Sequence, residues 1–184
     1  LALTVNMGAT ISVTGTTTIT RTTSATSNLS TTATNYALST GVLSIASGGT
    51  LTANGSAITI SGNYSNAGTY TAGTSDLTFT ATDTDNTLNP GSSSLYKLTF
   101  NGVGGAWDLT TNNLTVTNTL TITNGTFDLN ALNLTATGAT FSNDGTLRLS
   151  GSETLTGLTM DTNTGSVSYD GTSSYTGLAA GSSY

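Results

Sequence analysis

The chain has 184 residues, of which only three are basic and nine are acidic, so its formal net charge is −6 and charged residues make up 7% of the sequence. Soluble domains usually carry about a quarter charged residues, and here 45 threonines, together with serine, asparagine and glycine, are expected to supply most of the polar surface. A chain so poor in lysine and arginine is unsuited to neutralising phosphates, which excludes nucleic acid as a partner.

The sequence nevertheless predicts a folded chain. Apolar residues alternate with polar ones along much of it, the mean hydropathy is near zero, and Pro90 is the single proline, whereas disordered chains lack such apolar patterning. The absence of cysteine excludes disulfides and thiolate metal sites. No apolar run approaches the roughly eighteen residues of a membrane span, and no charged segment before an apolar one marks a signal peptide. Because the chain opens on Leu1 instead of methionine, we expect a secreted and processed product or a piece of a longer protein.

An alternating segment opens the chain. Its odd positions from Leu1 to Val13 are all apolar, while most of its even positions are polar. This period of two predicts a β-strand with one buried face. The strand is interpreted either as the first rung or cap of a stack, or as a donor strand that pairs with a neighbouring copy. The residues of self-association are then Leu1, Leu3, Val5, Met7, Ile11 and Val13.

Residues 1–40 are assigned to this strand or cap together with a polar insert. The segment from Arg21 to Gly41 is rich in threonine and serine and is the least patterned part of the chain. We therefore expect it to protrude or to form irregular rungs.

Two related units follow, residues 41–110 and 111–184. Leu43 and Ile45 recur as Leu120 and Ile122 at an offset of 77 residues, and the segment SNAGT at 65–69 recurs as SNDGT at 142–146. The second unit is truncated at its end relative to the first, and it has gained a segment at 149–164 that keeps alternating apolar residues. A repetitive stack accepts such a segment as one further rung.

The predicted elements are strands of three to five residues separated by glycine, asparagine, aspartate and serine, so the chain is expected to be all-β. Corners with positive φ are supplied by Asn-Gly at 54–55, 101–102 and 124–125 and by Asp-Gly at 144–145 and 170–171. Short strands and a variable unit length favour a parallel β-solenoid. Two tandem β-sandwich domains are the alternative, because antiparallel hairpins use the same corners.

No group of residues has the composition of a catalytic centre or a cofactor site. Histidine is absent, and paired carboxylates would lack their usual basic partners, so we predict no enzymatic activity and no cofactor. The acidic cluster at 83–86 does not match a calcium loop, because Thr87 and Leu88 stand where a ligand and the turn glycine belong. We interpret it as a solvated turn.

Aromatic side chains are the candidates for a ligand surface. Trp107, Tyr64, Tyr70 and Tyr96 have flat rings that, if exposed, would stack on sugar rings. They are the basis of an alternative function, a carbohydrate-binding adhesin module with surface glycans as its partners.

Four motifs resemble the β-strand repeats of very large bacterial surface proteins, such as autotransporter passengers and filamentous-haemagglutinin-like adhesins. They are LTFNG at 98–102, LTV at 114–116, LTITNGT at 120–126 and FSNDGT at 141–146. The resemblance spans most of residues 40–184 and implies a right-handed parallel β-solenoid that is extracellular or at the cell surface. It carries over no functional residue. Together with the opening strand, it leads us to expect a structural element of a filament, stalk or coat that associates end to end with itself or belongs to a longer array.

Overall fold

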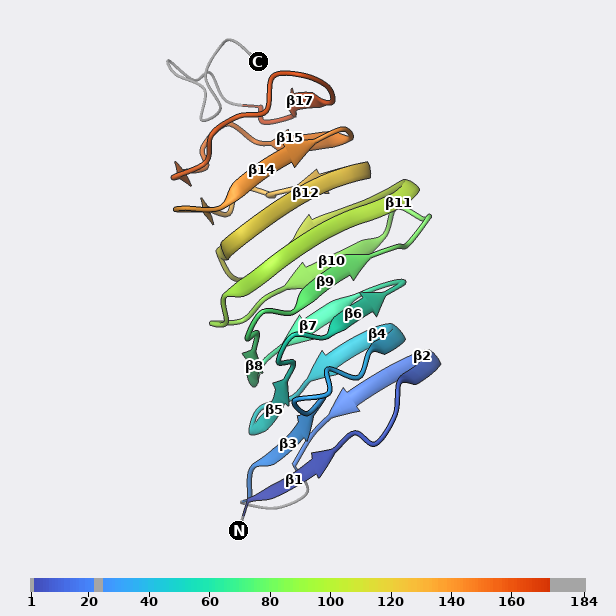
Figure 1. Cartoon of the computed structure of the whole chain (residues 1–184). Coiled ribbons are helices and arrows are strands. Elements are labelled where there is room, and N and C mark those ends of the chain that lie inside the picture. The colour runs from blue at the N-terminus through green and yellow to red at the C-terminus, as the bar shows by residue number, and fades with distance from the viewer. Residues whose placement is uncertain (1, 22–24, 173–184) are drawn as a thin grey trace.

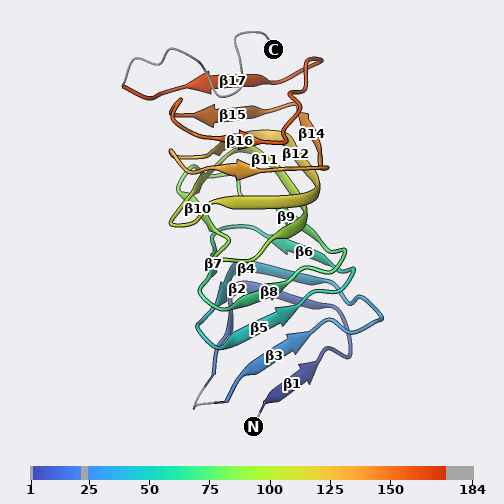
Figure 2. The same ribbon diagram turned by 90° about the vertical axis from the view of Figure 1, so that its left-hand side faces the viewer.

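The computed structural model describes residues 2–21 and 25–172. Over these residues the chain is a parallel β-solenoid of about eight turns, drawn as one continuous column of strands in Figures 1 and 2. All strand pairs of the described residues are parallel. The predicted all-β parallel solenoid is thus confirmed, and the alternative of two tandem β-sandwich domains is wrong, because sandwiches pair their strands antiparallel. The right hand of the coil stays a prediction.

Strand pairing divides each turn into three sides. The first side contains β1 (Leu3–Asn6), β3 (Ser27–Ser30), β5 (Gly49–Thr52), β8 (Thr69–Thr71), β13 (Leu134–Thr135) and β16 (Leu155–Thr156). The second contains β6 (Ala57–Ile60), β9 (Asp76–Phe79) and β14 (Thr140–Asn143), and the third contains β7 (Tyr64–Asn66), β10 (Asn86–Asn89), β15 (Thr146–Leu149) and β17 (Ser166–Tyr169). Four long strands bend around corners: β2 (Ile11–Ile19) and β4 (Leu38–Ile45) cover the second and third sides, and β11 (Leu95–Leu109) and β12 (Leu114–Asp128) reach all three.

The interior is built from columns of inward-facing side chains. Alternate residues of a strand point to opposite faces, so stacking strands in register places apolar residues above one another. On the first side, Val5, Leu29, Leu51 and Tyr70 pair in successive turns. Threonine and serine occupy many of the alternate, outward positions, which is why a chain with so few charges still has a polar surface.

Aromatic residues fill the centre of the solenoid. Phe79, Phe100 and Phe127 stack on one another through successive turns, with ring centroids 5.4 Å and 4.3 Å apart. Trp107, which is fully buried, lies 5.1 Å from the ring of Phe100. The middle turns therefore have a continuous aromatic core.

Buried asparagines connect the turns at the corners. The side-chain Nδ2 of Asn66 donates to the carbonyl of Pro90 at 3.0 Å, and that of Asn143 donates to the carbonyl of Ser166 at 2.9 Å. Both residues are at least 97% buried, so these hydrogen bonds satisfy backbone groups that turn away from the strand ladders.

The repeat seen in the sequence is not the repeat of the structure. Leu43 lies on the third side, whereas its sequence counterpart Leu120 lies on the second, one side short of four full turns away. The boundary between the two sequence units, at residue 110, falls between β11 and β12. These two strands pair with each other on all three sides, so the structure has no division there.

The structure also shows how the segments 21–41 and 149–164 contribute to the turns. Within the segment 21–41, β3 and β4 pair with both neighbouring turns, with one register shift between β2 and β4, so these described strands belong to rungs and do not protrude. Residues 22–24 lie outside the described residues. The segment 149–164 contributes β16 to the first side of the last described turn, and its interpretation as one further rung stays a prediction.

Candidate functional site: the N-terminal face

The first turn leaves its inward-facing apolar side chains uncovered. Leu3 is 61% exposed and Val5 53% exposed, although Val5 belongs to the same column as Leu51, which is fully buried two turns above. Ile11, which begins the second-side column, is 36% exposed. These residues are exposed because no further rung lies beneath them among the described residues, and not because they point outward.

The backbone of the first turn has a free edge as well. Within the described residues, β1 pairs only with β3, and β2 only with β4. The amides of Leu3 and Met7 donate to β3 and its flank at 3.0 Å and 2.8 Å. Because alternate residues of a strand direct their polar groups to opposite edges, those of Thr4 and Asn6 point to the free edge. Such an edge is a template for pairing with another chain.

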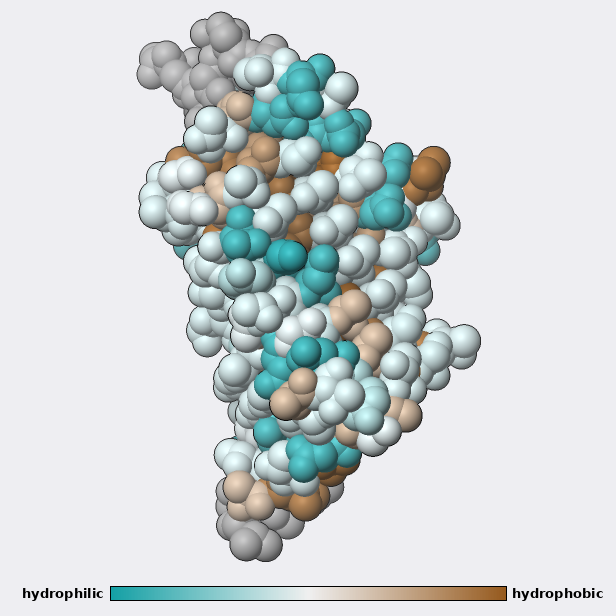
Figure 3. Space-filling model, viewed as in Figure 1, coloured by the Kyte–Doolittle hydropathy of each residue, from teal (hydrophilic) through white to brown (hydrophobic). Residues whose placement is uncertain are grey.

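A shallow hollow of about 270 Å³ lies at this end of the molecule. It is lined by Leu3, Val5, Thr17, Thr18, Ile19, Thr20, Ser27, Asn28 and Leu29, none of which is charged. Figure 3 shows apolar surface at the end where Figure 1 places β1. We call Leu3, Val5, Ile11, Leu29 and the free edges of β1 and β2 the N-terminal face.

The predicted self-association residues fall into two groups. Leu3, Val5 and Ile11 meet on the N-terminal face, with Val13 half-buried beside them. Met7 is only 4% exposed and belongs to the core, so it is unavailable to a partner. Leu1 lies outside the described residues.

The predicted aromatic surface is largely absent. Tyr64, Tyr70 and Trp107 are buried in the core, so the expectation that they form exposed platforms for sugar rings is wrong. Each occupies an inward position of its strand, and Tyr64 and Tyr70 pack edge to face with ring centroids 6.3 Å apart. Tyr96 alone of the four is partly exposed.

Burial of these tyrosines predicts a loss of stability at alkaline pH. Burial raises the pKa of Tyr70 to about 12, opposed by a hydrogen bond with Ser75, and raises the pKa of Tyr64 as well. An unfolded tyrosine ionises near pH 10. The contribution of Tyr70 to the free energy of unfolding is therefore constant below pH 10. It falls by about 1.4 kcal/mol per pH unit between pH 10 and 12, where only the unfolded tyrosine is ionised.

This decline can be measured by urea denaturation at pH 8, 10 and 11.5. Tyr70→Phe removes one ionising group and is expected to make the decline shallower, with Tyr64 contributing the remainder. A free energy of unfolding that is constant up to pH 11.5 would contradict the prediction.

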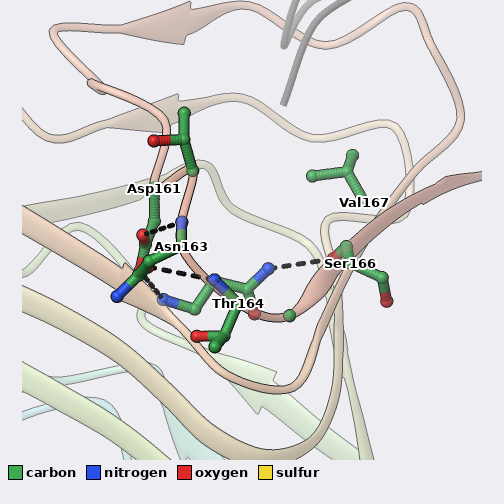
Figure 4. A pocket seen from close by; sticks show the side chains of 8 residues that line it. Asp161, Asn163, Thr164, Ser166 and Val167 are labelled. Carbon is green, nitrogen blue, oxygen red and sulfur yellow. Dashed lines mark hydrogen bonds between the residues drawn. The ribbon is translucent and has the colours of Figure 1, made fainter.

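A small polar pocket of about 190 Å³ lies at a corner of the last described turn (Figure 4). Its carboxylate, Asp161, accepts hydrogen bonds from the backbone amides of Asn143 at 2.9 Å and Asn163 at 3.1 Å, and these bonds lower the pKa of Asp161. The carboxylate thus holds the 161–165 loop in place. Across the described ranges no three acidic, histidine or cysteine side chains are grouped so as to hold a metal ion.

The acidic cluster at 83–86 is also a corner. The Nδ2 of Asn86 donates to the carbonyl of Asp83 at 2.9 Å and to that of Ala106, in the next turn, at 3.1 Å. Asn86 therefore links two successive turns by a side-chain hydrogen bond, as Asn66 and Asn143 do.

No protein-family model, curated protein or solved structure matches the chain. In the part of the chain that the structure describes, no helix is long and apolar enough to cross a lipid bilayer. A function for the N-terminal face is therefore inferred from the geometry of the face alone.

Proposed function

We propose that the chain is a non-catalytic structural rod that associates end to end with further copies, as an element of an extracellular filament, stalk or coat on a bacterial surface. The observation that carries this proposal is the N-terminal face, where apolar columns and strand edges are uncovered together. Another coil placed on this face would bury Leu3 and Val5 and pair the free edge.

The expected gain from this contact is substantial. Fully burying a leucine or valine side chain is worth about 1.5–3 kcal/mol, and pairing a free strand edge adds hydrogen bonds. Natural solenoids cover such ends with caps to prevent stacking. The stacked ladders of about eight turns also make the molecule rigid along its axis, as a stalk requires.

The extracellular location rests on the resemblance of the segments at 98–102, 114–116, 120–126 and 141–146 to the repeats of bacterial surface proteins. Protease treatment of intact cells that produce the chain tests it, since an extracellular chain is digested while an internal one is protected. The alternative of a glycan-binding module has lost three of its four candidate aromatics to the core.

The proposal predicts assembly of the purified protein without any ligand. Analytical ultracentrifugation and electron microscopy are expected to show end-to-end oligomers or fibres at micromolar concentration. The double variant Leu3→Asp/Val5→Asp places two carboxylates on the N-terminal face, and it should raise the dissociation constant at least about a hundredfold, which corresponds to some 3 kcal/mol.

Val103→Asp is the matched control for this variant. Val103 is an apolar side chain exposed to 75%, but it lies in a bulge of β11, away from the N-terminal face. This control is expected to assemble like the original protein. A wild-type chain that stays monomeric at all concentrations, or a Leu3→Asp/Val5→Asp variant that assembles normally, would overturn the proposal.

A further inference from the structure

We infer that the partner of the N-terminal face is the C-terminal turn of a second copy, so that the chains assemble head to tail with one polarity. This inference rests on the proposed end-to-end association and specifies which surfaces meet. It is carried by three independent features of the described residues.

The first feature is the apolar surface of the last described turn. Leu155, Met160 and Val167 are only partly buried, whereas Leu134 and Leu147, one turn earlier, are completely buried. Among the described residues β16 pairs only with β13, and β17 only with β15. The last described turn thus resembles the first turn in having apolar columns that are less buried than those of the turns between them.

The second feature is the distribution of charge along the axis. Arg21 is the single charged side chain among residues 1–75, and all nine acidic residues lie between Asp76 and Asp170. Asp144, Glu153, Asp161 and Asp170 belong to the last two turns, where Arg148 is the single basic residue. A head-to-tail contact brings the acidic end to the end that carries Arg21, whereas a tail-to-tail contact brings two acidic ends together, which is unfavourable.

The third feature is strand direction. Every pair of described strands is parallel and most pairs are in register. A second copy placed head to tail continues this pattern as one further rung, with its inward columns aligned with those below. A head-to-head contact would instead require antiparallel pairing, which the fold uses nowhere in its described part. Because a head-to-tail contact does not close on itself, it generates an open filament.

Head-to-tail stacking predicts which residues lie side by side across the contact. On the third side one outward-facing column begins at Thr16, beside Val42, and ends at Ser168, beside Arg148. In the assembly Thr16 of one copy therefore lies next to Ser168 of the other. Neighbouring strands are about 4.8 Å apart, which is within the range of roughly 4.4–6.8 Å that a disulfide bridges between Cα atoms.

Oxidative cross-linking tests this register, and the natural chain is a silent control because it contains no cysteine. Thr16 is exposed and Ser168 partly exposed and outward-facing, so replacing them should leave the fold intact. Under a mild oxidant, the double variant Thr16→Cys/Ser168→Cys is expected to give a ladder of covalent multimers on a non-reducing gel. A mixture of the two single variants should give covalent dimers and nothing larger, and each single variant alone should stay monomeric on the gel.

Three results separate failure of this inference from failure of the proposed function. Covalent dimers of Thr16→Cys alone would show a head-to-head contact and overturn the inference. Chains that associate in the ultracentrifuge but cross-link in no variant would also overturn it, because the surfaces in contact would be different ones. A natural chain that does not associate at all would overturn the proposed function itself.

Discussion

Replacing Phe100 with alanine is expected to lower the free energy of unfolding by about 3–5 kcal/mol. Phe100 is fully buried and contacts three other aromatic residues, since it stacks between Phe79 and Phe127 and packs against Trp107. Its removal leaves a cavity in the middle of the solenoid, where the turns above and below are held by strand ladders and cannot collapse into the space. Urea denaturation followed by tryptophan fluorescence measures the effect, because Trp107 reports on the same cluster.

Tyr96→Ala is the matched control for Phe100→Ala. Tyr96 is an aromatic residue of the same strand, β11, but it is only partly buried. Its replacement is expected to cost less than about 1 kcal/mol, since substitutions at the surface usually change stability by about 0.5 kcal/mol or less and Tyr96 is only partly buried. Equal losses in the two variants would contradict the position of Phe100 at the centre of the core.

Replacing Gly125 with alanine is expected to cost about 2–5 kcal/mol. Gly125 has a φ of +86°, and a Cβ there would lie 2.5 Å from the carbonyl oxygen of Gly105 and 2.8 Å from that of Gly102. The positive φ alone costs an L-residue roughly 1–2 kcal/mol, and overpacking against backbone atoms adds about 1–3 kcal/mol. Because the obstructing atoms belong to the turn below, the strain would separate the two turns at this corner.

Gly138→Ala isolates the steric part of this cost. Gly138 has a similar φ of +78°, but a Cβ there would meet nothing within 4 Å. Gly138→Ala is expected to lower the free energy of unfolding only by the cost of a positive φ in alanine, about 1–2 kcal/mol. Thermal or urea denaturation of the two variants side by side gives the difference, and an equal loss in both would show that close stacking at Gly125 is unimportant.

The corner at Gly125 recurs with a glycine in successive turns of the solenoid. Gly105, Gly125, Gly145 and Gly165 stack at successive turns, and a Cβ on any of the last three would clash with a carbonyl of the turn below. The inward residues Trp107, Phe127, Leu147 and Val167 follow the same spacing of 20 residues. This spacing is present in the sequence and would have revealed the turn length.

The 20-residue period was hidden by the chemistry of the columns. An inward position accepts any apolar side chain of suitable volume, so tryptophan, phenylalanine, leucine and valine follow one another in a single column and share no recognisable motif. The offset of 77 residues was more conspicuous because it compares strand-and-corner segments that are similar in sequence. Such a segment occurs on both the second and the third side, and for this reason Leu43 and Leu120 resemble one another while lying on different sides.

The sequence by itself determined the all-β class and the apolar columns, because alternation with a period of two and short strands between turn residues are local properties of the chain. It favoured the parallel solenoid, but only the pairing of distant strands excluded the antiparallel sandwiches. It also placed Leu3, Val5 and Ile11 in one set, but that set included Met7, which the structure buries in the core. Only the tertiary structure decided that Trp107, Tyr64 and Tyr70 face inward and that the first turn is uncovered. The direction of a side chain near a corner depends on register, and β11 shifts register twice between Phe100 and Ala106. Exposure of a column depends on whether another turn lies against it, and no local pattern contains that information.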